Sequence, residues 1–279
     1  METTDYALGQ TDAEIERVRA QARLWAADTA RLLDRLGLTA GERCLDAGCG
    51  PGETMRLMAD RVGPSGQVTG IDLDPGISRL APGRVIIHDL TADEPVPGGP
   101  YDLVHARLLL FHTPRPAQVL RRLWDAVAPG GRLLVQDYDM RPVGVNPQLD
   151  VSEEMTGLVL AAFGAAGCDV RAGSRLPYLM AEAGIGAPDG TDVAGRLVPS
   201  AAGLPILESV YRSLLPVAFA HGLTTPEESG KAIDALRRAT AANPHRYVLL
   251  PLLNGAWKVK DHARADGAGA RRRTGNRGS

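Results

Sequence analysis

The sequence has 279 residues, of which 44% are hydrophobic and 23% are charged. A chain of this length fits one large α/β domain, or a domain with a helical insertion, and can bury a core without disulfides or structural metals. The formal net charge of −2 is close to neutral. It therefore gives no support for a nucleic-acid-binding protein, which is often strongly basic, or for a disordered chain, which is often strongly acidic. The cysteines, Cys44, Cys49 and Cys168, show no paired framework and no metal-ligand spacing, so we expect no metal site.

Both ends of the chain are polar. The N-terminal segment carries polar and acidic side chains, and no apolar run approaches the ~20 residues of a membrane helix, which predicts a cytoplasmic protein without membrane contact. From Lys258 onward, seven basic residues stand against two acidic ones. The three arginines at 271–273 suit either a nucleic-acid arm or a solvated tail. Because glycine, alanine and arginine offer little to bury, we expect residues 261–279 to be a disordered basic tail.

The first half of the chain alternates between strand and helix patterns. Residues 12–36 have apolar side chains at helical spacing, ended by Gly37. Short β-branched segments then alternate with amphipathic ones, and this alternation predicts a parallel sheet with right-handed crossovers, covered on both faces. We expect strands at 43–46, 67–71, 84–87, 101–106 and 132–136, and helices at 53–62 and 116–127.

Beyond residue 140 helical patterns dominate. We expect helices at 149–166, 175–183, 204–220 and 226–242, a strand at 193–198, and apolar segments at 247–252 and 257–260. The predicted fold is therefore α/β, a doubly wound, seven-stranded, mostly parallel sheet with a helical lid. We expect the last pair of strands to include one antiparallel edge strand.

The most informative segment is the glycine-rich turn that follows the first predicted strand. Strand, glycine-rich turn and helix bring backbone close to a ligand at the carboxyl edge of a parallel sheet. A dinucleotide fold uses the spacing G-x-G-x-x-G, whereas Gly48, Gly50 and Gly52 have the spacing G-x-G-x-G. Asp46, two residues before the first glycine, would repel a pyrophosphate but could hold a cationic amino-acid end. These residues argue against a dinucleotide.

Residues 45–52 resemble motif I of class I S-adenosylmethionine-dependent methyltransferases, and the resemblance extends over about the first 140 residues. It implies that Asp72 binds the ribose hydroxyls, that Leu73 lies against adenine, and that Asp89 receives the adenine amino group. Residues 101–107 and 123–135 resemble the fourth motif and the helix, turn and fifth strand. The cofactor-binding residues that we infer are Asp46, Gly48, Gly50, Asp72, Leu73, Asp89, Leu90 and Arg107.

The run HARLLLFHTPRP at residues 105–116 resembles the small-molecule branch typified by ubiquinone and menaquinone biosynthesis methyltransferases, and bacterial tailoring enzymes. The (D/N)-P-P-(Y/F) motif of base-methylating enzymes is missing from this place, which speaks against nucleic-acid bases as acceptors. The resemblance implies methyl transfer to a small-molecule acceptor in secondary metabolism or quinone-type biosynthesis. It favours O- or C-directed transfer and leaves N-directed transfer and a homodimer open.

Three residues are candidates for the chemical step: His112, His105 and Asp137. Methyl transfer is an in-line displacement, so the protein mainly aligns the reactants, and a base is needed only if the acceptor must lose a proton. His112 has a reference pKa near ~6.5, suited to that task, but it could instead pack the proline turn beside it. His105 could contact a ligand or be structural. Asp137 could orient the acceptor or be a solvated loop acid, and Arg107 could meet the cofactor carboxylate or hold a lid segment.

These inferences divide the chain into four parts. We expect residues 1–40 to form an N-terminal lid helix and residues 41–140 to form the S-adenosylmethionine-binding core. We expect residues 141–260 to complete the core and to carry a helical substrate cap, with an insertion at about 200–243, before the basic tail. Three alternatives stay open: an S-adenosylmethionine-binding protein with non-methylating chemistry such as a cyclase, an NAD(P)-dependent oxidoreductase, and an RNA-modifying enzyme guided by the tail.

Overall fold

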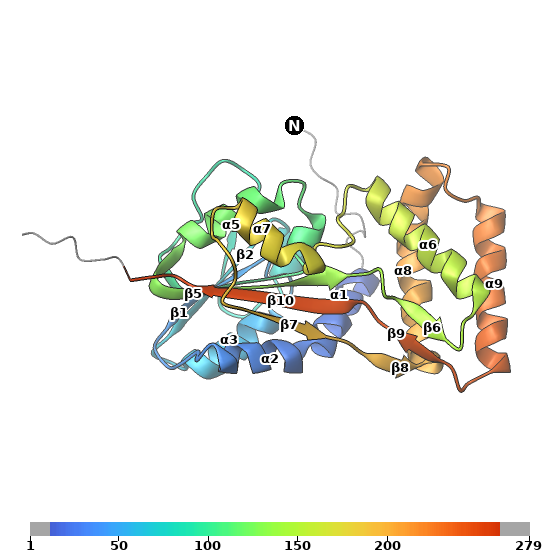
Figure 1. Cartoon of the computed structure of the whole chain (residues 1–279), viewed down its shortest axis with the longest axis horizontal. Helices are drawn as coiled ribbons and strands as arrows, with labels where there is room; N and C mark the ends of the chain where they lie inside the picture. Colours follow the sequence, from blue (N-terminus) through green and yellow to red (C-terminus); the bar gives the residue numbers. More distant parts are fainter. Residues whose placement is uncertain (1–11, 263–279) are drawn as a thin grey trace, which may run out of the picture.

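The structure is a computed structural model that describes residues 12–262, so the arginines at 271–273 lie outside the described residues. An α/β core and a helical cap lie side by side along the long axis (Figure 1). The helical segments are α1 (Asp12–Leu24), α2 (Ala26–Arg35), α3 (Glu53–Val62), α4 (Pro75–Ser78), η1 (Leu110–His112), α5 (Pro116–Asp125), α6 (Asp150–Ala165), η2 (Gly173–Arg175), α7 (Leu176–Glu182), α8 (Ser200–Ala220) and α9 (Pro226–Ala242). The strands are β1 (Arg43–Ala47), β2 (Gln67–Asp72), β3 (Arg84–Ile87), β4 (Tyr101–Arg107), β5 (Val127–Asp139), β6 (Gly144–Asn146), β7 (Gly190–Ala194), β8 (Leu197–Pro199), β9 (Tyr247–Leu249) and β10 (Leu252–Val259).

Within residues 12–262, seven strands form the main sheet in the order β3-β2-β1-β4-β5-β10-β7. β1 to β5 are parallel, and β10 is antiparallel to both β5 and β7. The predicted seven-stranded, mostly parallel sheet is confirmed. The expected position of the antiparallel strand is wrong, because β10 lies inside the sheet and β7 forms the edge. The chain leaves the main sheet after β5 to form β6 and α6, and leaves it again after β7 to form β8, α8, α9 and β9. It then returns as β10, which inserts between β5 and β7.

Helices cover both faces of the main sheet. α5 and α7 lie above it and α2 and α3 below it in the view of Figure 1. Buried side chains of α5 and α7 join one hydrophobic cluster with the inner strands, and those of α2 and α3 join another. The sequence favours these helices locally: α5 begins with Pro116, whose missing N–H suits the first helical turn, and α9 begins with a capping box between Thr225 and Glu228.

The cap stands beyond the carboxyl ends of the parallel strands (Figure 1). It combines α6, α8 and α9 with a small sheet in the order β6-β9-β8, around a third hydrophobic cluster. The predicted strand at 193–198 is divided: β7 belongs to the main sheet and β8 to the small one. The apolar segment 247–252 is divided in the same way between β9 and β10. Their β-branched residues gave no sign of this change of partner.

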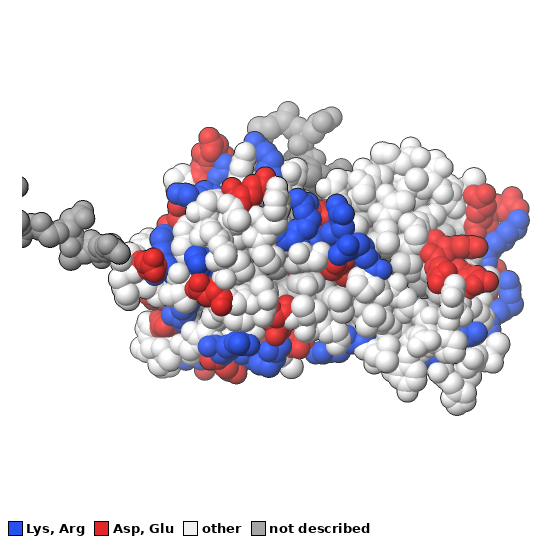
Figure 2. Space-filling view, in the orientation of Figure 1, with Lys and Arg blue, Asp and Glu red and all other residues white. Residues whose placement is uncertain are grey.

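The predicted helix at 12–36 is two helices, because the backbone breaks at Trp25, whose side chain is fully buried. Among the described residues, no helix is both long and apolar enough to cross a membrane, and no group of three or more metal-ligating side chains occurs. Figure 2 shows acidic and basic side chains mixed over the core on the face in view, with a broad uncharged area over the lower part of the cap.

Candidate cofactor site

The glycine-rich turn lies at the carboxyl end of β1, where the strand order reverses between β1 and β4. Open α/β sheets bind ligands at such a reversal point. Gly48, Gly50 and Gly52 have φ values of 71°, 48° and 78°, in the left-handed region that favours glycine. The backbone N–H groups of Gly48 and Cys49 donate to the carbonyl oxygen of Ile71 over 2.8 and 3.0 Å, which ties the turn to β2.

The three glycines have different surroundings. A Cβ at Gly52 would lie 2.5 Å from Cδ of Pro82, and one at Gly48 would lie 3.2 Å from Cδ1 of Leu109. A Cβ at Gly50 would meet no atom within 4 Å. Gly52 is therefore required by packing within the protein, whereas Gly50 faces open space.

Asp72 ends β2 directly beside this open space. One carboxylate oxygen accepts from the N–H of Gly50 over 2.7 Å, and the other accepts from the N–H of Asp74 over 2.9 Å. Burial raises the pKa of Asp72, and these two N–H groups act in the opposite direction. Leu73 is 55% exposed, and Ile87, the register partner of Asp72 on β3, is 52% exposed. An acid between two exposed apolar side chains offers hydrogen bonding and apolar contact to one ligand.

Asp89 and Leu90 follow β3 and differ in what they contact. An Asp89 oxygen accepts from the N–H and the hydroxyl of Thr91, both over 2.7 Å, and the Thr91 hydroxyl holds the pKa of Asp89 below its usual value. The Leu90 side chain is buried in the core, and its carbonyl oxygen accepts from Arg122. The side chain of Leu90 thus packs in the core, and its carbonyl oxygen is bound by Arg122.

Asp46 belongs to a chain of buried side chains from four elements. His105 Nδ1 lies 2.8 Å from Asp46 Oδ1, and His105 Nε2 lies 3.4 Å from Gln136 Oε1. The hydroxyl of Thr29, on α2, donates to Gln136 Oε1 over 2.8 Å and accepts from Arg107 Nη1 over 2.9 Å. His105 is 0% exposed. The structure therefore gives His105 a role inside the sheet and not in contact with an acceptor.

Arg107 ends β4, and its side chain is partly buried. Burial lowers its pKa, and the carboxylates of Asp46 and Glu53 act in the opposite direction at longer range. In the part of the chain that the structure describes, its side chain bonds to Thr29 and makes no ion pair. A partly buried cation without a close anion gains from an anionic partner, so Arg107 suits a ligand carboxylate.

Asp137, near the end of β5, is also 0% exposed. Its carboxylate accepts from the N–H of Phe111 over 3.0 Å and from the N–H of Tyr138 over 2.8 Å, which holds η1 against β5. Burial raises the pKa of Asp137 to about 7. Asp137 is thus neither a solvated loop acid nor exposed to an acceptor. It fixes the turn that carries His112.

His112 lies at the end of η1, in the join between core and cap. Its ring packs edge-on against Phe111 with centroids 4.9 Å apart, and its Nδ1 lies 3.5 Å from Sγ of Cys168. The Phe111 carbonyl oxygen accepts from the N–H of Asp169, so the loop after α6 is fastened to η1 directly beside His112. Burial raises the pKa of Cys168 to about 11, so Cys168 is a neutral neighbour of His112 near pH 7.

The break between α1 and α2 is fixed to the end of β5. The indole N–H of Trp25 donates to the hydroxyl of Tyr138 over 2.6 Å, and Gln21 Nε2 donates to the same oxygen over 3.1 Å. Arg196 stacks over the Trp25 ring and pairs with Asp28. The N-terminal helices therefore pack on the strand ends that carry the candidate site.

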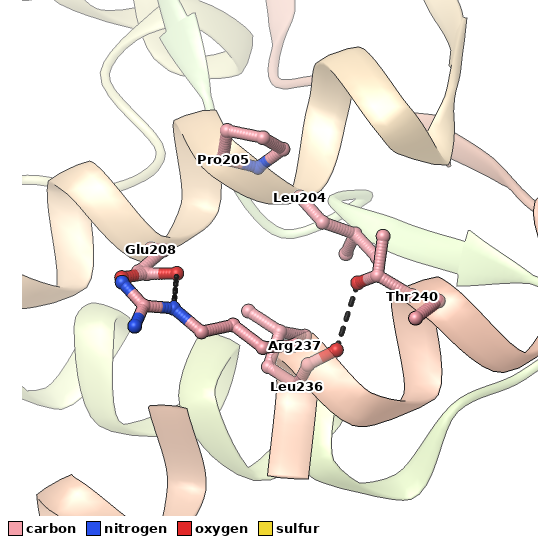
Figure 3. Close-up of a pocket in the computed structure, with 7 residues that line it drawn as sticks. Leu204, Pro205, Glu208, Leu236, Arg237 and Thr240 are labelled. Carbon is pink, nitrogen blue, oxygen red and sulfur yellow. Dashed lines mark hydrogen bonds and ion pairs between the residues drawn. The ribbon is translucent and has the colours of Figure 1, made fainter. Parts of the chain in front are cut away.

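A hollow of about 250 Å³ opens elsewhere, between α8 and α9 (Figure 3). Glu208 and Arg237 face each other at one end of it, joined by hydrogen bonds of 2.7 and 3.1 Å. Its lining comes entirely from these two cap helices: Leu204, Pro205, Glu208, Leu236, Arg237, Thr240 and Ala241. It is smaller than the ~300 Å³ at which drug-sized pockets begin, and it is separate from the candidate cofactor site.

Sequence reasoning missed three residues of this region: Thr29, Gln136 and Ile87. Ile87 had a usable signal, because it ends an apolar strand directly before Asp89. Thr29 and Gln136 had none, because their contact joins residues 107 positions apart and neither belongs to a motif.

The chain is similar to several known proteins. A family described as "Methyltransferase domain" matches residues 17–183. Methyltransferase str3 of Strobilurus tenacellus is 35% identical over 160 residues, which cover 56% of this chain and 57% of that protein. The ubiquinone biosynthesis O-methyltransferase of Aeromonas salmonicida is 36% identical over 120 residues, which cover 40% of this chain and 49% of that protein. The chain thus spans about half the length of these curated relatives.

The fold has solved counterparts. Phosphoethanolamine N-methyltransferase 2 of Haemonchus contortus, in complex with phosphomonomethylethanolamine and S-adenosylhomocysteine, superposes with a TM-score of 0.54 at 16% identity, over 94% of this chain and 61% of that one. At this identity the likeness shows the fold alone. The match over residues 17–183 shows the family, confirms the resemblance drawn from the motifs, and decides against an oxidoreductase. The chain belongs to the methyltransferase domain family, within the class I S-adenosylmethionine-dependent methyltransferases.

Proposed function

We propose that this protein transfers the methyl group of S-adenosylmethionine to a small-molecule acceptor. The observation that carries the proposal is the hydrogen bond between the N–H of Gly50 and the carboxylate of Asp72. The turn has open space at Gly50, and exposed Leu73 and Ile87 flank the acid. A nucleoside needs such a set, since it combines hydroxyl groups with an apolar ring system. When bound, the cofactor supplies an electrophilic methyl group on its sulfonium sulfur.

Each part of the site matches one part of this cofactor. Asp72 would accept hydrogen bonds from the ribose hydroxyls, and Leu73 and Ile87 would cover the adenine. Asp89 would accept from the adenine amino group. At the other end of the glycine turn, Arg107 would bind the carboxylate of the methionine part. Asp46, held by His105, would face its ammonium group. The sulfonium methyl would then point toward the ends of β4 and β5, near His112.

The acceptor would enter between the core and the cap. The hydrophobic cluster of the cap reaches the strand ends through Phe111, Tyr138 and Met140 and continues into α6 with Met155 and Val159. An apolar or aromatic molecule suits such a surface. The names of the relatives favour small molecules of secondary metabolism or quinone-type biosynthesis.

We assign the proton transfer to His112. An acceptor hydroxyl or carbon acid must lose a proton as it is methylated, whereas a neutral amine attacks through its lone pair. His112 is the only one of the three candidates that lies on the core–cap join, since His105 and Asp137 are buried inside the sheet. This position favours O- or C-directed transfer.

The test is formation of S-adenosylhomocysteine in the presence of a panel of phenols, hydroxyquinones and aryl amines, on wild type and on His112→Asn. We expect acceptor-dependent product with a phenolic or quinone compound, and a loss of about 100-fold in kcat for the variant. An unchanged kcat with a phenol would contradict the role of His112. Binding of cofactor without turnover of any panel member would favour non-methylating chemistry.

The other expectations continue as proposals from sequence alone: a cytoplasmic location, a homodimer, a lid formed by residues 1–40 and an acceptor-selective segment at 200–243. Exchange of residues 200–243 for those of a relative should move acceptor preference while cofactor affinity stays unchanged. Loss of cofactor affinity in that chimera would contradict the division into core and cap.

A further inference from the structure

The buried chain from Arg107 to Asp46 joins the two groups that would face opposite charges of one ligand end. Arg107 is suited to a carboxylate and Asp46 to an ammonium group. Between them stand Thr29, Gln136 and His105, which belong to α2, β5 and β4, and each contact lies between 2.8 and 3.4 Å. A change at any link therefore reaches both ends of the amino-acid subsite.

Thr29 is the critical link, because one hydroxyl serves both sides. Its oxygen accepts from Arg107 and its proton goes to Gln136 Oε1, so the donor and acceptor roles of the hydroxyl are both used. The side chain is fully buried, which keeps water from replacing either bond. Serine can repeat this geometry. Valine has nearly the shape of threonine but can neither donate nor accept.

Helix α2, which carries Thr29, is held to the core by charged contacts on both sides of this residue. Asp28 pairs with Arg196, and Arg31 pairs with Asp192 over 2.7 Å. Trp25 at the start of the helix is bound to Tyr138. Thr29 is thus presented by a fixed element, and the Arg107 guanidinium is oriented before a ligand arrives, which lowers the entropic cost of binding.

We propose that Thr29 is a positioning residue for the amino-acid end of S-adenosylmethionine, acting on Arg107 directly and on Asp46 through Gln136 and His105. This inference rests on the proposed function, because it needs that cofactor in the site. The inference predicts selectivity: substitution of Thr29 should weaken the affinity for ligands that carry the amino-acid end and should not change the affinity for ligands that lack it.

The experiment compares two ligands by calorimetric titration. S-adenosylhomocysteine carries the amino-acid end, and 5′-methylthioadenosine keeps the adenosine and the sulfur but lacks that end. For Thr29→Val we expect an S-adenosylhomocysteine affinity about tenfold weaker or worse, with 5′-methylthioadenosine affinity unchanged within about twofold. Thr29→Ser should restore the affinity of S-adenosylhomocysteine.

Thr69→Val is the matched control, since Thr69 is also buried, in β2, and stands outside the chain of contacts, and it should leave both affinities unchanged. Thermal melts establish that each variant is folded. If Thr29→Val does not fold, Gln136→Met replaces it, because it breaks the next link and should show the same ligand selectivity.

The outcomes are distinct. An equal loss for both ligands, or no loss for either, overturns the role of Thr29 while the proposed function stands. Failure of folded wild type to bind either ligand overturns the proposed function itself, and the role of Thr29 with it. Selective loss with rescue by serine establishes the positioning role.

Discussion

The ends of β2 and β3 and the ends of β4 and β5 lie along the same edge of one sheet, yet they present opposite chemistry. At the first pair, Leu73 and Ile87 are more than half exposed beside Asp72. At the second pair, His105 and Asp137 are buried and engaged with backbone and side chains. The first region is open to a ligand, and the second holds its polar groups inside the protein.

The difference teaches that an acid or histidine near a strand end is not thereby a ligand group. Asp72 and Asp137 both accept two backbone hydrogen bonds, but Asp72 does so beside open space and Asp137 does so within packed protein. The surrounding side chains decide the role. We therefore expect substitutions of Asp72 and Leu73 to affect binding, and substitution of Asp137 to affect stability.

The largest expected effect is on stability at Asp137. Asp137→Ala leaves the N–H groups of Phe111 and Tyr138 without their acceptor in a buried place, so we expect the free energy of unfolding to fall by about 3 kcal/mol in denaturant titration. Asp93→Ala removes an acid whose side chain is fully exposed and should cost less than about 0.5 kcal/mol. Equal effects of the two substitutions would show that Asp137 is not a structural acid.

The second prediction concerns pH. Burial raises the pKa of Asp137 from 3.8 to about 7, so between these values the unfolded chain has released a proton that the folded protein keeps. Rising pH then lowers the free energy of unfolding across this interval, by up to about 1.4 kcal/mol per pH unit. The difference in stability between wild type and Asp137→Asn, measured from pH 4 to pH 8, should shrink or reverse as pH rises. A difference independent of pH would contradict it.

The third prediction separates two glycines of the turn. Gly52→Ala brings a Cβ within 2.5 Å of Pro82, whereas Gly50→Ala meets no atom within 4 Å, and both residues have positive φ. We expect Gly52→Ala to be less stable than Gly50→Ala by about 1 kcal/mol in thermal unfolding. Gly50→Ala should instead weaken S-adenosylhomocysteine binding. The reverse pattern would mean that Gly50 does not face the ligand.

The smallest effect is expected at Leu73. Leu73→Ala removes an exposed apolar contact, so stability should be unchanged and S-adenosylhomocysteine affinity should fall about threefold. Leu223→Ala removes a similarly exposed leucine after α8 and serves as the control, with no effect on affinity. Equal affinities for the two variants would exclude Leu73 from the adenine contact.

Sequence reasoning reached the core of the fold because the core is periodic and rich in motifs. The strand ending at Asp72 and the glycine turn at Gly50 are local signals, and the structure keeps both. The cap was harder, because residues 193–198 were predicted as one strand, whereas their two halves pair in different sheets. Pairing partners that lie 48 to 67 residues away cannot be read from a local pattern.

The same limit applies to the candidate site. Motif residues such as Asp72 can be recognised from the residues next to them in the sequence. The burial of His105 and Asp137 depends instead on elements far away along the chain. Thr29 donates to Gln136, and Asp137 accepts from Phe111, across contacts that no motif records. The roles of the polar side chains at β4 and β5 required the packed structure.

The most direct test of the central claim is calorimetric titration of S-adenosylhomocysteine into wild type and Asp72→Ala. The account predicts saturable binding by wild type and a loss of about 1–3 kcal/mol in the variant, which is about 5- to 150-fold in affinity, with the fold intact by thermal melt. Binding by Asp72→Ala as tight as by wild type would contradict the account and place the ligand elsewhere on the protein.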